Sequence, residues 1–456
     1  MNYKSIYVIG IGGTSMSGIA QILHSWGIQV TGSDRAESIF TKKLEEKGIK
    51  VYYHQGKENI TNDYDLVVYT AAIKEDHEEL HQARNIGIKT MERGEFLGEI
   101  TKLFPKTIGI SGTHGKTTTT AMTSKIWIDA NLDPSIQVGA HLSFLNGNYR
   151  VGKSPYFIIE ACEYCDSFLN FDIESAVVLN IDDDHLDYFK TMENTRNSFQ
   201  KYVSKVKSEG VLILNQDDEY CYELRNYTKA KVITIGSKNA DYTYRNVVYN
   251  TQGYPTYDLY YQNEYLGKIS LSVPGMHNIY NSLSSIALSR FYGISLDQIK
   301  KSLSQFHGAS RRLEYKGMFK GGRVYDDYGH HPTEVEAVAK SIQEMDYHKS
   351  FVIFEPHTYS RLISHLKDFA SSLSMFDEII IYKIYAAREE NLFHISEDNL
   401  KEELQKLGKS SVVIKDFTSI KEYLENNIHK SDIVITLGAG EITKLSEILT
   451  KEESKC

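Results

Sequence analysis

The sequence predicts an α/β protein with three domains: a Rossmann-like N-terminal domain, a central phosphate-loop (P-loop) ATPase-type domain with an antiparallel β meander, and a C-terminal doubly wound, Rossmann-like domain. Two observations from the pattern favour this fold class. An apolar strand runs into a glycine turn and a helix twice, near residues 5–26 and 107–130, and the last third alternates short strands with amphipathic helices. The third observation is length, because 456 residues fit about three domains. We place them at 1–104, 105–312 and 313–456.

Composition narrows the class of partner. The chain has 51 Lys and Arg against 60 Asp and Glu, a formal charge of −9, and no basic run, so we expect no nucleic-acid partner. No apolar stretch reaches the ~18 residues that span a bilayer, and no signal peptide is evident, so we expect a cytoplasmic protein without membrane insertion. Four cysteines in so long a chain fit a reducing compartment, and Cys162 and Cys165 lack the second pair that would complete a zinc site.

The N-terminal domain is expected to begin with a strand at residues 5–9, followed by a glycine turn and a helix. A second strand at 28–31 leads to Asp34, an acid about twenty residues beyond the glycines, where a dinucleotide fold holds a ribose hydroxyl. Two further strands are expected near 50–53 and 65–69. Since Ser15 replaces the third glycine of G-x-G-x-x-G, a nicotinamide cofactor is only one option.

The centre of the chain carries a candidate phosphate-binding loop. Gly112 and Gly115 allow a tight turn between a buried strand and a helix, so that backbone N–H groups can face an anion. Lys116 can reach the outer phosphates of a nucleoside triphosphate, and the Thr117 hydroxyl can ligate its magnesium. The strict consensus fails at Ile110, where glycine is required, so only the shorter G-x-x-G-K-T is met. A glycine turn before a solvated helix face is the alternative.

Two strands of the central domain end in hard metal ligands. One apolar strand leads to Glu160, and the next leads to a polar run that includes His185. Oxygen-rich positions at the C-terminal ends of parallel strands, facing a phosphate loop, are what a magnesium ion needs, so we expect Glu160 and His185 to be ligands. The alternative is a polar loop that caps the following helix through Asp187 or Thr191.

Later in the central domain, residues 241–272 alternate tyrosine, valine and leucine, which predicts an antiparallel meander. A turn then starts a helix in which Asn278 and Asn281 fall on one face, because they are three residues apart. Paired asparagine amides can contact an adenine edge, while helix capping by Asn278 is the alternative.

The C-terminal domain is expected to contain strands near 324–326, 351–354, 378–384, 411–414 and 432–437, separated by amphipathic helices. Polar clusters follow four of these strands, and they include Asp327, His330 and Arg361. Ligands of open α/β sheets bind outside the C-terminal ends of the strands. The clusters therefore predict a ligand site in this domain.

Four motifs carry a resemblance that runs nearly from end to end of the chain. They are the glycine-rich start at 10–20, Gly112-Thr113-His114-Gly115-Lys116-Thr117-Thr118, Pro274-Gly275-Met276-His277-Asn278, and Asp326-Asp327-Tyr328-Gly329-His330-His331-Pro332-Thr333-Glu334. Together they resemble the ATP-dependent Mur ligases of peptidoglycan synthesis. The last motif is the most specific. Combined with the glycine-rich start, it is similar to the members that join L-alanine to UDP-N-acetylmuramate, a combination that sister ligases lack as a group.

The resemblance implies a role for each matching position. ATP would be held by Gly112, Thr113, His114, Gly115, Lys116, Thr117, Thr118, His277, Asn278, Asn281, Arg312 and Asp327. Mg²⁺ would be held by Thr117, Glu160 and His185. UDP-N-acetylmuramate and L-alanine would contact Gly10, Gly12, Gly13, Thr14, Ser15, Asp34, Thr70, Arg93, His185, His330 and Arg361. The catalytic set would be Lys116, His330, Arg361 and Asp327.

The resemblance also implies a reaction in which the muramoyl carboxylate attacks the γ-phosphate and the alanine amine then attacks the acyl phosphate, with His330 orienting the amine or taking its proton. Since ATP and the UDP-sugar would lie on different domains, we expect the third domain to close over them, in a monomer or homodimer. The chain departs from the family pattern at Thr358, often arginine, and at Cys162, often aspartate. Gln200 stands where several sister ligases use a carbamylated lysine.

Three other interpretations stay open. The chain could be another ligase of the superfamily, such as the murein tripeptide recycling enzyme or a folylpolyglutamate synthetase, although the folate enzyme has no UDP group for the glycine-rich domain to hold. A non-catalytic nucleotide-binding protein would leave Lys116, Thr117 and Glu160 without a purpose. A nicotinamide oxidoreductase would leave the phosphate loop unexplained.

Overall fold

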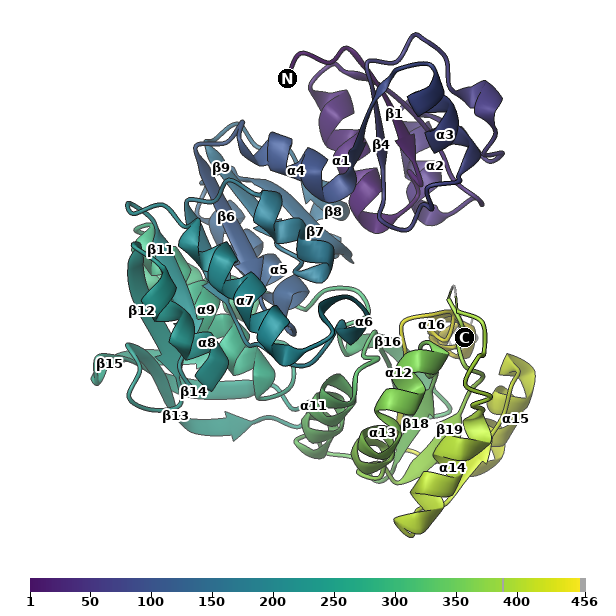
Figure 1. The fold of residues 1–456 in the computed structure, drawn as a ribbon. Coiled ribbons are helices and arrows are strands. Elements are labelled where there is room, and N and C mark those ends of the chain that lie inside the picture. Colours follow the sequence, from purple (N-terminus) through teal and green to yellow (C-terminus); the bar gives the residue numbers. More distant parts are fainter. Residues whose placement is uncertain (388, 452–456) are drawn as a thin grey trace. The chain divides into compact units, whose positions relative to one another are not determined.

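The computed structural model describes residues 1–387 and 389–451, apart from the side chains of Leu186 and Asp187. The possible cap Asp187 and the fourth cysteine, Cys456, therefore lie outside the described part. Three sheets organise the chain, and the predicted α/β fold class is confirmed (Figure 1). The chain divides into two compact units: one contains residues 1–243, 260–264 and 280–302, and the other contains 244–259, 265–279 and the chain from 303 onward.

The first sheet is parallel, with strand order β3-β2-β1-β4-β5. Its strands are β1 (Ser5–Ile9), β2 (Gln29–Ser33), β3 (Lys50–Tyr52), β4 (Leu66–Tyr69) and β5 (Lys89–Glu92). The helices of this segment are α1 (Thr14–Ser25), α2 (Ile39–Glu46), α3 (Glu78–Asn85) and α4 (Arg93–Thr101). Along β1, Ile6 and Val8 join the core with α1 and α2, while Tyr7 and Ile9 join the core with α3. Both faces are buried, which explains the unbroken apolar run.

The second sheet has the order β15-β14-β13-β12-β11-β10-β6-β9-β7-β8. Its strands are β6 (Lys106–Ser111), β7 (Ser135–Leu142), β8 (Gly147–Arg150), β9 (Tyr156–Glu160), β10 (Ser175–Val178), β11 (Val211–Asn215), β12 (Lys231–Gly236), β13 (Tyr242–Tyr249), β14 (Pro255–Tyr261) and β15 (Glu264–Ser270). The helices are α5 (Lys116–Asp129), α6 (Leu186–Phe189), α7 (Met192–Ser204), α8 (Glu219–Glu223), α9 (His277–Phe291) and α10 (Leu296–Ser304). The region predicted as a meander forms the neighbouring strands β13 to β15.

Helices α5 and α9 are joined by a regular series of polar contacts. Hydroxyl and amide groups pair as Thr119 with Asn281, Thr123 with Ser285, and the Trp127 indole with Ser289, each at 3.1 Å. The pairs recur every four residues on both helices, which is about one helical turn. These contacts satisfy the buried polar groups on the facing sides of the two helices.

The third sheet has the order β16-β17-β21-β18-β19-β20, and only the β16–β17 pair is antiparallel among its paired strands. Its strands are β16 (Glu314–Phe319), β17 (Gly322–Asp327), β18 (Ser350–Phe354), β19 (Glu378–Ile381), β20 (Ser411–Val413) and β21 (Ile433–Leu437). Its helices are α11 (Pro332–Gln343), α12 (Tyr359–Ser364), α13 (Leu366–Leu373), α14 (Glu397–Lys406), α15 (Phe417–Asn427) and α16 (Thr443–Thr450).

Helices cover both faces of the third sheet. Val352 and Phe354 of β18 share a core with α11, α13 and α14, whereas the alternate residues Phe351 and Ile353 share a core with α15 and α16. This is the doubly wound arrangement that the sequence predicts. Among the described residues, no helix is both long enough and apolar enough to cross a membrane.

Candidate active site

The phosphate loop lies between β6 and α5, and it is pinned by Asn180 at the end of β10. The Asn180 amide accepts a hydrogen bond from the His114 backbone N–H (2.7 Å) and donates one to the His114 carbonyl (3.0 Å). Gly112 and Gly115 have φ of 129° and 85°, conformations that favour glycine. A side chain on Gly115, the residue before the helix, would come within 2.6 Å of the Asn281 amide oxygen. Thr118, also predicted to hold nucleotide, is buried in α5.

Lys116 lies inside this loop and is paired with Glu163. Its Nζ donates to the carbonyls of Gly112 (2.6 Å) and Thr113 (2.9 Å) and to Glu163 Oε1 (3.0 Å). The side chain of Glu163 is only 2% exposed. Burial acts to lower the pKa of Lys116, but the Glu163 carboxylate and other anionic neighbours outweigh it and raise that pKa. The lysine is therefore a fixed cation.

The predicted metal ligands Thr117 and Glu160 meet at the start of α5. The Thr117 hydroxyl donates to Glu160 Oε1 at 2.8 Å, and the Gly139 backbone N–H donates to Glu160 Oε2 at 2.6 Å. Glu160 is the last residue of β9, and Gly139 lies on the neighbouring strand β7. The pair thus offers two hard oxygen ligands beside the phosphate loop.

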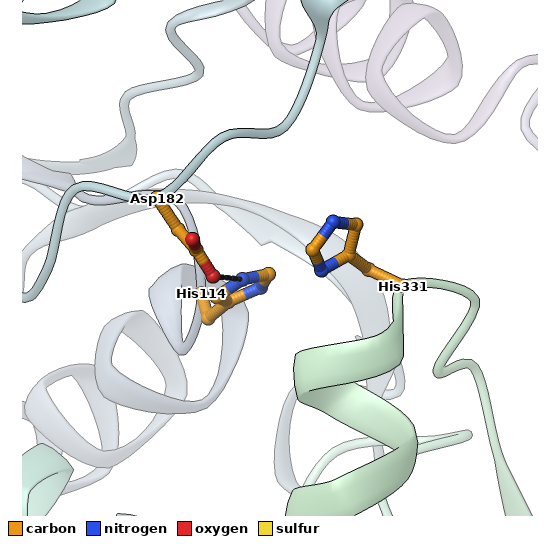
Figure 2. Close-up of side chains that lie close together, drawn as sticks. All are labelled: His114, Asp182 and His331. Atoms are coloured by element: carbon orange, nitrogen blue, oxygen red, sulfur yellow. Dashed lines mark hydrogen bonds and ion pairs between the residues drawn. The ribbon is translucent and has the colours of Figure 1, made fainter. Parts of the chain in front are cut away.

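The polar run after β10 also returns to the loop. Asp182 accepts at its Oδ2 from His114, with 3.1 Å to Nε2 (Figure 2), and its backbone N–H donates to the Thr113 hydroxyl. His185 has a left-handed backbone (φ 58°), and its ring lies 4.7 Å from that of Tyr164. Thr191 caps α7 by accepting from the Asn194 N–H.

The glycine-rich loop of the N-terminal segment gathers the predicted UDP-sugar residues. The carboxylate of Asp34 accepts from the backbone N–H groups of Gly12 and Arg35, both at 2.8 Å. Gly10 has φ of 77°, and a side chain there would meet Thr70 at 3.1 Å. Gly13 precedes α1, which starts at Thr14. Asp34 is therefore engaged with the loop itself in this structure.

A second group around this loop ties Ser15 to other segments. The Ser15 hydroxyl lies 3.4 Å from Arg93 Nη1 and 3.0 Å from Gln137 Nε2, and Gln137 also donates to the Ser15 carbonyl at 3.2 Å. Asn148 donates to the Thr14 carbonyl. No pattern in the sequence indicated Gln137 or Asn148, since neither belongs to a motif and both contact residues more than a hundred positions away.

The asparagines of α9 differ in their contacts. Asn281 accepts from the Thr119 hydroxyl of α5 at 3.1 Å, which places its amide beside the phosphate loop. The amide of Asn278 donates to the Pro274 carbonyl at 2.7 Å, and its backbone N–H donates to the Gly275 carbonyl. His277, the first residue of α9, is exposed.

In the C-terminal segment, Asp327 contacts the residue that follows Arg312, and Arg312 lies over the residue that follows Asp327. Asp327 is buried and accepts from the backbone N–H groups of Leu313 and Gly329, both at 2.6 Å. Burial raises the pKa of Asp327 to about 6, against the opposing effect of Arg312. The guanidinium groups of Arg311 and Arg312 lie over the ring of Tyr328, 4.8 and 5.4 Å from its centre.

His330 and Arg361 are linked through His357. The ring centres of His330 and His357 are 5.2 Å apart, and Arg361 Nη1 lies 3.1 Å from His357 Nδ1. His330 Nδ1 lies 3.0 Å from the Tyr328 carbonyl, an acceptor, so Nδ1 carries the proton and Nε2 is the basic nitrogen. Thr358 adopts φ of 63° and caps α12 through its hydroxyl. His331 is the residue before α11, which begins at Pro332.

Among the described residues, Cys162, Cys165 and Cys221 are thiols that form no disulfide. Burial raises the pKa of Cys162 to about 11, with Glu163 adding to the effect. The thiol is therefore neutral at physiological pH and is a poor nucleophile.

Three family models match consecutive parts of the chain: "Mur ligase family, catalytic domain" at residues 5–105, "Mur ligase middle domain" at 110–289, and "Mur ligase, glutamate ligase domain" at 311–440. The chain belongs to the Mur ligase family. The resemblance seen in the sequence is thereby confirmed, and so is the ligase class.

Among Mur ligases, the chain is 43% identical to a UDP-N-acetylmuramate–L-alanine ligase of Acetivibrio thermocellus, over 99% of this chain and 96% of that protein. It is 45% identical to the enzyme of the same name from Caldicellulosiruptor saccharolyticus, over 98% of each. The crystal structure of MurC, the UDP-N-acetylmuramate-alanine ligase of Thermotoga maritima, matches with a TM-score of 0.85 at 25% identity and covers 99% of both chains. A murein peptide ligase from Psychrobacter arcticus shares the fold, with a TM-score of 0.72 at 22% identity over 98% of both.

Proposed function

We propose that this Mur ligase joins L-alanine to the lactyl carboxylate of UDP-N-acetylmuramate and converts ATP to ADP and phosphate. The product is UDP-N-acetylmuramoyl-L-alanine, a precursor of peptidoglycan. One observation carries the proposal: relatives named for this reaction match 98–99% of the chain at 43–45% identity. The phosphate loop with its paired lysine and the polar strand ends of the C-terminal segment supply the chemistry that such a ligase needs.

The chemistry starts from a carboxylate, which is a poor electrophile in water. One of its oxygens attacks the γ-phosphorus, the bond to the β–γ bridging oxygen breaks, and ADP leaves as the acyl phosphate forms. We infer that Lys116 stabilises the charge on the transferring phosphoryl oxygens, because its ammonium is held at the loop by two backbone carbonyls. The backbone N–H groups of the loop and Asn281 would position the nucleotide.

We propose that Thr117 and Glu160 hold the magnesium ion, with His185 as a further ligand. The fit rests on Thr117 Oγ1 and Glu160 Oε1, which lie 2.8 Å apart beside the phosphate loop and are the hard oxygens that this ion prefers. When bound, magnesium neutralises charge on the β- and γ-phosphates. The Gly139 N–H would keep Glu160 in place, because it binds the other carboxylate oxygen.

The second half-reaction needs a neutral amine. The alanine nitrogen attacks the acyl carbon, phosphate leaves, and one amine proton must be removed. We propose His330 for this proton, because its Nδ1 faces a carbonyl and Nε2 is left as the base. Arg361, fixed by His357, would bind the carboxylate of alanine or of the muramoyl group. Arg312 and Asp327 would contribute to the nucleotide site from the same segment.

The test is phosphate release from ATP and magnesium with UDP-N-acetylmuramate, with L-alanine present, absent, or replaced by L-alanyl-γ-D-glutamyl-diaminopimelate. We expect turnover that needs L-alanine and a product with the mass of UDP-N-acetylmuramoyl-L-alanine. Turnover with the tripeptide alone would indicate a recycling ligase, and no turnover with any amine would indicate a binding protein.

A Lys116→Ala variant provides the matched control for this assay. We expect it to lose phosphate release while it keeps its affinity for UDP-N-acetylmuramate, because Lys116 belongs to the phosphate loop and not to the glycine-rich loop. Titration calorimetry with UDP-N-acetylmuramate measures the second quantity. Loss of both phosphate release and affinity for UDP-N-acetylmuramate would contradict separate sites for the two substrates.

A further inference from the structure

Strand β7 lies between the two ligand loops of the first compact unit. At one position, Gln137 donates from Nε2 to the carbonyl (3.2 Å) and hydroxyl (3.0 Å) of Ser15, beside the glycine-rich loop. A backbone carbonyl can only accept, so the nitrogen of the amide must face Ser15 and the oxygen must face away. The orientation of Gln137 is therefore fixed by the N-terminal segment.

Two residues further along the same strand, β7 reaches the phosphate-loop side. The Gly139 N–H donates to Glu160 Oε2 at 2.6 Å, and Glu160 Oε1 accepts from the Thr117 hydroxyl at 2.8 Å. A side chain on Gly139 would come within 2.9 Å of the Glu160 carboxylate, so the strand and the carboxylate are in close contact. An unbroken series of short contacts thus leads from Ser15 to Thr117.

Stability alone does not explain a glutamine at position 137. Its side chain is 4% exposed, and in the described part of the chain its Oε1 is buried without a hydrogen-bond partner. An unmet buried acceptor costs about 1–3 kcal/mol, about as much as the two hydrogen bonds to Ser15 contribute, so the glutamine brings little net stability. The glutamine is therefore best explained by its two hydrogen bonds, which tie β7 to Ser15 beside the glycine-rich loop.

We propose that Gln137 is a positioning residue that couples the two substrates, so that sugar-nucleotide bound at the glycine-rich loop fixes β7 and thereby the Glu160–Thr117 pair. The proposal rests on the function proposed above, because it takes UDP-N-acetylmuramate as the ligand of that loop. Coupling of this kind is reciprocal: each ligand must raise the affinity for the other by the same factor.

The experiment measures the dissociation constant of UDP-N-acetylmuramate by titration calorimetry, with and without a saturating non-hydrolysable ATP analogue and magnesium. For the unaltered protein we expect the analogue to tighten binding at least about fivefold, the lower end of typical coupling between sites. For Gln137→Met, which keeps the length but loses both polar groups, we expect a factor below about twofold. Gln137→Glu keeps acceptors but cannot donate to Ser15, and we expect it to lose the coupling too.

Asn148→Ala provides the matched control. Asn148 is 2% exposed and holds the same helix end through the Thr14 carbonyl, but it lies on β8, which reaches Gly139 through its pairing with β7 and not through the Gln137 amide. We expect weaker sugar-nucleotide binding with an unchanged coupling factor. Thermal melting checks that each variant is folded. If Gln137→Met is not folded, the coupling factor of Gln137→Glu tests the inference.

Two results would overturn the inference. One is a coupling factor of one in the unaltered protein, and the other is a full coupling factor in both folded Gln137 variants. If the unaltered protein binds no UDP-N-acetylmuramate at all, the proposed function fails instead, so the two failures are distinguishable.

Discussion

The ammonium of Lys116 is held by the buried carboxylate of Glu163, with 3.0 Å between Nζ and Oε1. Lys116 could be predicted because glycines, lysine and threonine are contiguous in one motif. Glu163, its buried partner, lies 47 residues away, and only its closeness to Glu160 in the sequence hinted at a role. Gln137 gave no signal, since its partner Ser15 is 122 residues distant. Contacts of this range depend on the folded sheet and cannot be read from local pattern.

The Lys116–Glu163 pair predicts that, once the pair is broken, the melting temperature depends more strongly on bound ATP. In Glu163→Gln the buried ammonium loses its counter-charge, and breaking such a pair costs about 3–5 kcal/mol. The phosphates of ATP would restore a negative partner. We therefore expect a melting temperature well below that of the unaltered protein without ligand, and a larger increase when ATP and magnesium are added. Differential scanning fluorimetry measures both.

One control variant sharpens this prediction. Glu163→Asp keeps the charge and should melt closer to the unaltered protein, although its shorter side chain weakens the contact. An equal ATP-induced increase in melting temperature in all three proteins would show that the ATP phosphates do not replace the Glu163 carboxylate as the counter-charge of Lys116.

Asp327 predicts a specific dependence of stability on pH. Burial raises its pKa from 3.8 in the unfolded chain to about 6, so between these values the folded state binds more protons than the unfolded state. The contribution is fully present below pH 3.8 and is lost as pH rises through 6. About two pKa units correspond to about 3 kcal/mol. Urea unfolding of the unaltered protein and of Asp327→Asn should show a difference in free energy that falls by this amount from pH 4 to 7.

The decisive observation is the direction in which this difference in unfolding free energy changes as pH rises. Other carboxylates titrate in the same range, but they contribute equally to both proteins and cancel. A difference that stays constant with pH would mean that Asp327 is ionised throughout, and that Arg312 offsets the effect of burial.

At the scale of elements, the regular strands with apolar runs were predicted and the irregular ones were not. Strand β1 coincides with the expected 5–9, and β9 is the expected apolar strand that leads to Glu160; their central residues are buried on both faces of the sheet. Strand β2 begins and ends later than the expected 28–31, at Gln29–Ser33. Strands β7, β8 and β16 were missed, since glycine and polar residues interrupt them. Antiparallel pairing of β7 with β8 and of β16 with β17 holds them in place.

The junction between the phosphate loop and α5 gives a prediction at this scale. Gly115→Ala places a Cβ at a φ of 85° and within 2.6 Å of the Asn281 amide oxygen. We expect the loop to shift and ATP affinity to fall at least about tenfold, an effect of about 1.4 kcal/mol. Equilibrium binding of a fluorescent ATP analogue measures this.

Gly27→Ala is the matched control for that variant. Gly27 has a similar φ of 82°, but no atom lies within 4 Å of the position where its Cβ would be. It should cost roughly 1 kcal/mol of stability through backbone strain and leave ATP affinity unchanged. Equal losses of affinity in both variants would show that strain, and not the contact with Asn281, governs the loop.

At the scale of the whole molecule, the residues to which the proposed reaction gives roles lie in different compact units, Lys116 in the first and His330 and Arg361 in the second. We therefore expect small-angle scattering to show a lower radius of gyration when a non-hydrolysable ATP analogue and UDP-N-acetylmuramate are both bound than with either alone. An unchanged radius would mean that no closure accompanies binding. The domain boundaries, the cytoplasmic location and the monomeric or homodimeric state stay predictions.

The contacts between α5 and α9 have a consequence for how the chain is made. Each of the three pairs joins residues 162 positions apart. Helix α9 therefore cannot pack against α5, the helix that follows the phosphate loop, until 162 further residues have left the ribosome. At about 5–20 residues per second, this takes roughly 8 to 30 s. During that interval the hydroxyls of Thr119 and Thr123 have no partner from α9. The nascent nucleotide site is thus finished late, well after its own motif has been synthesised.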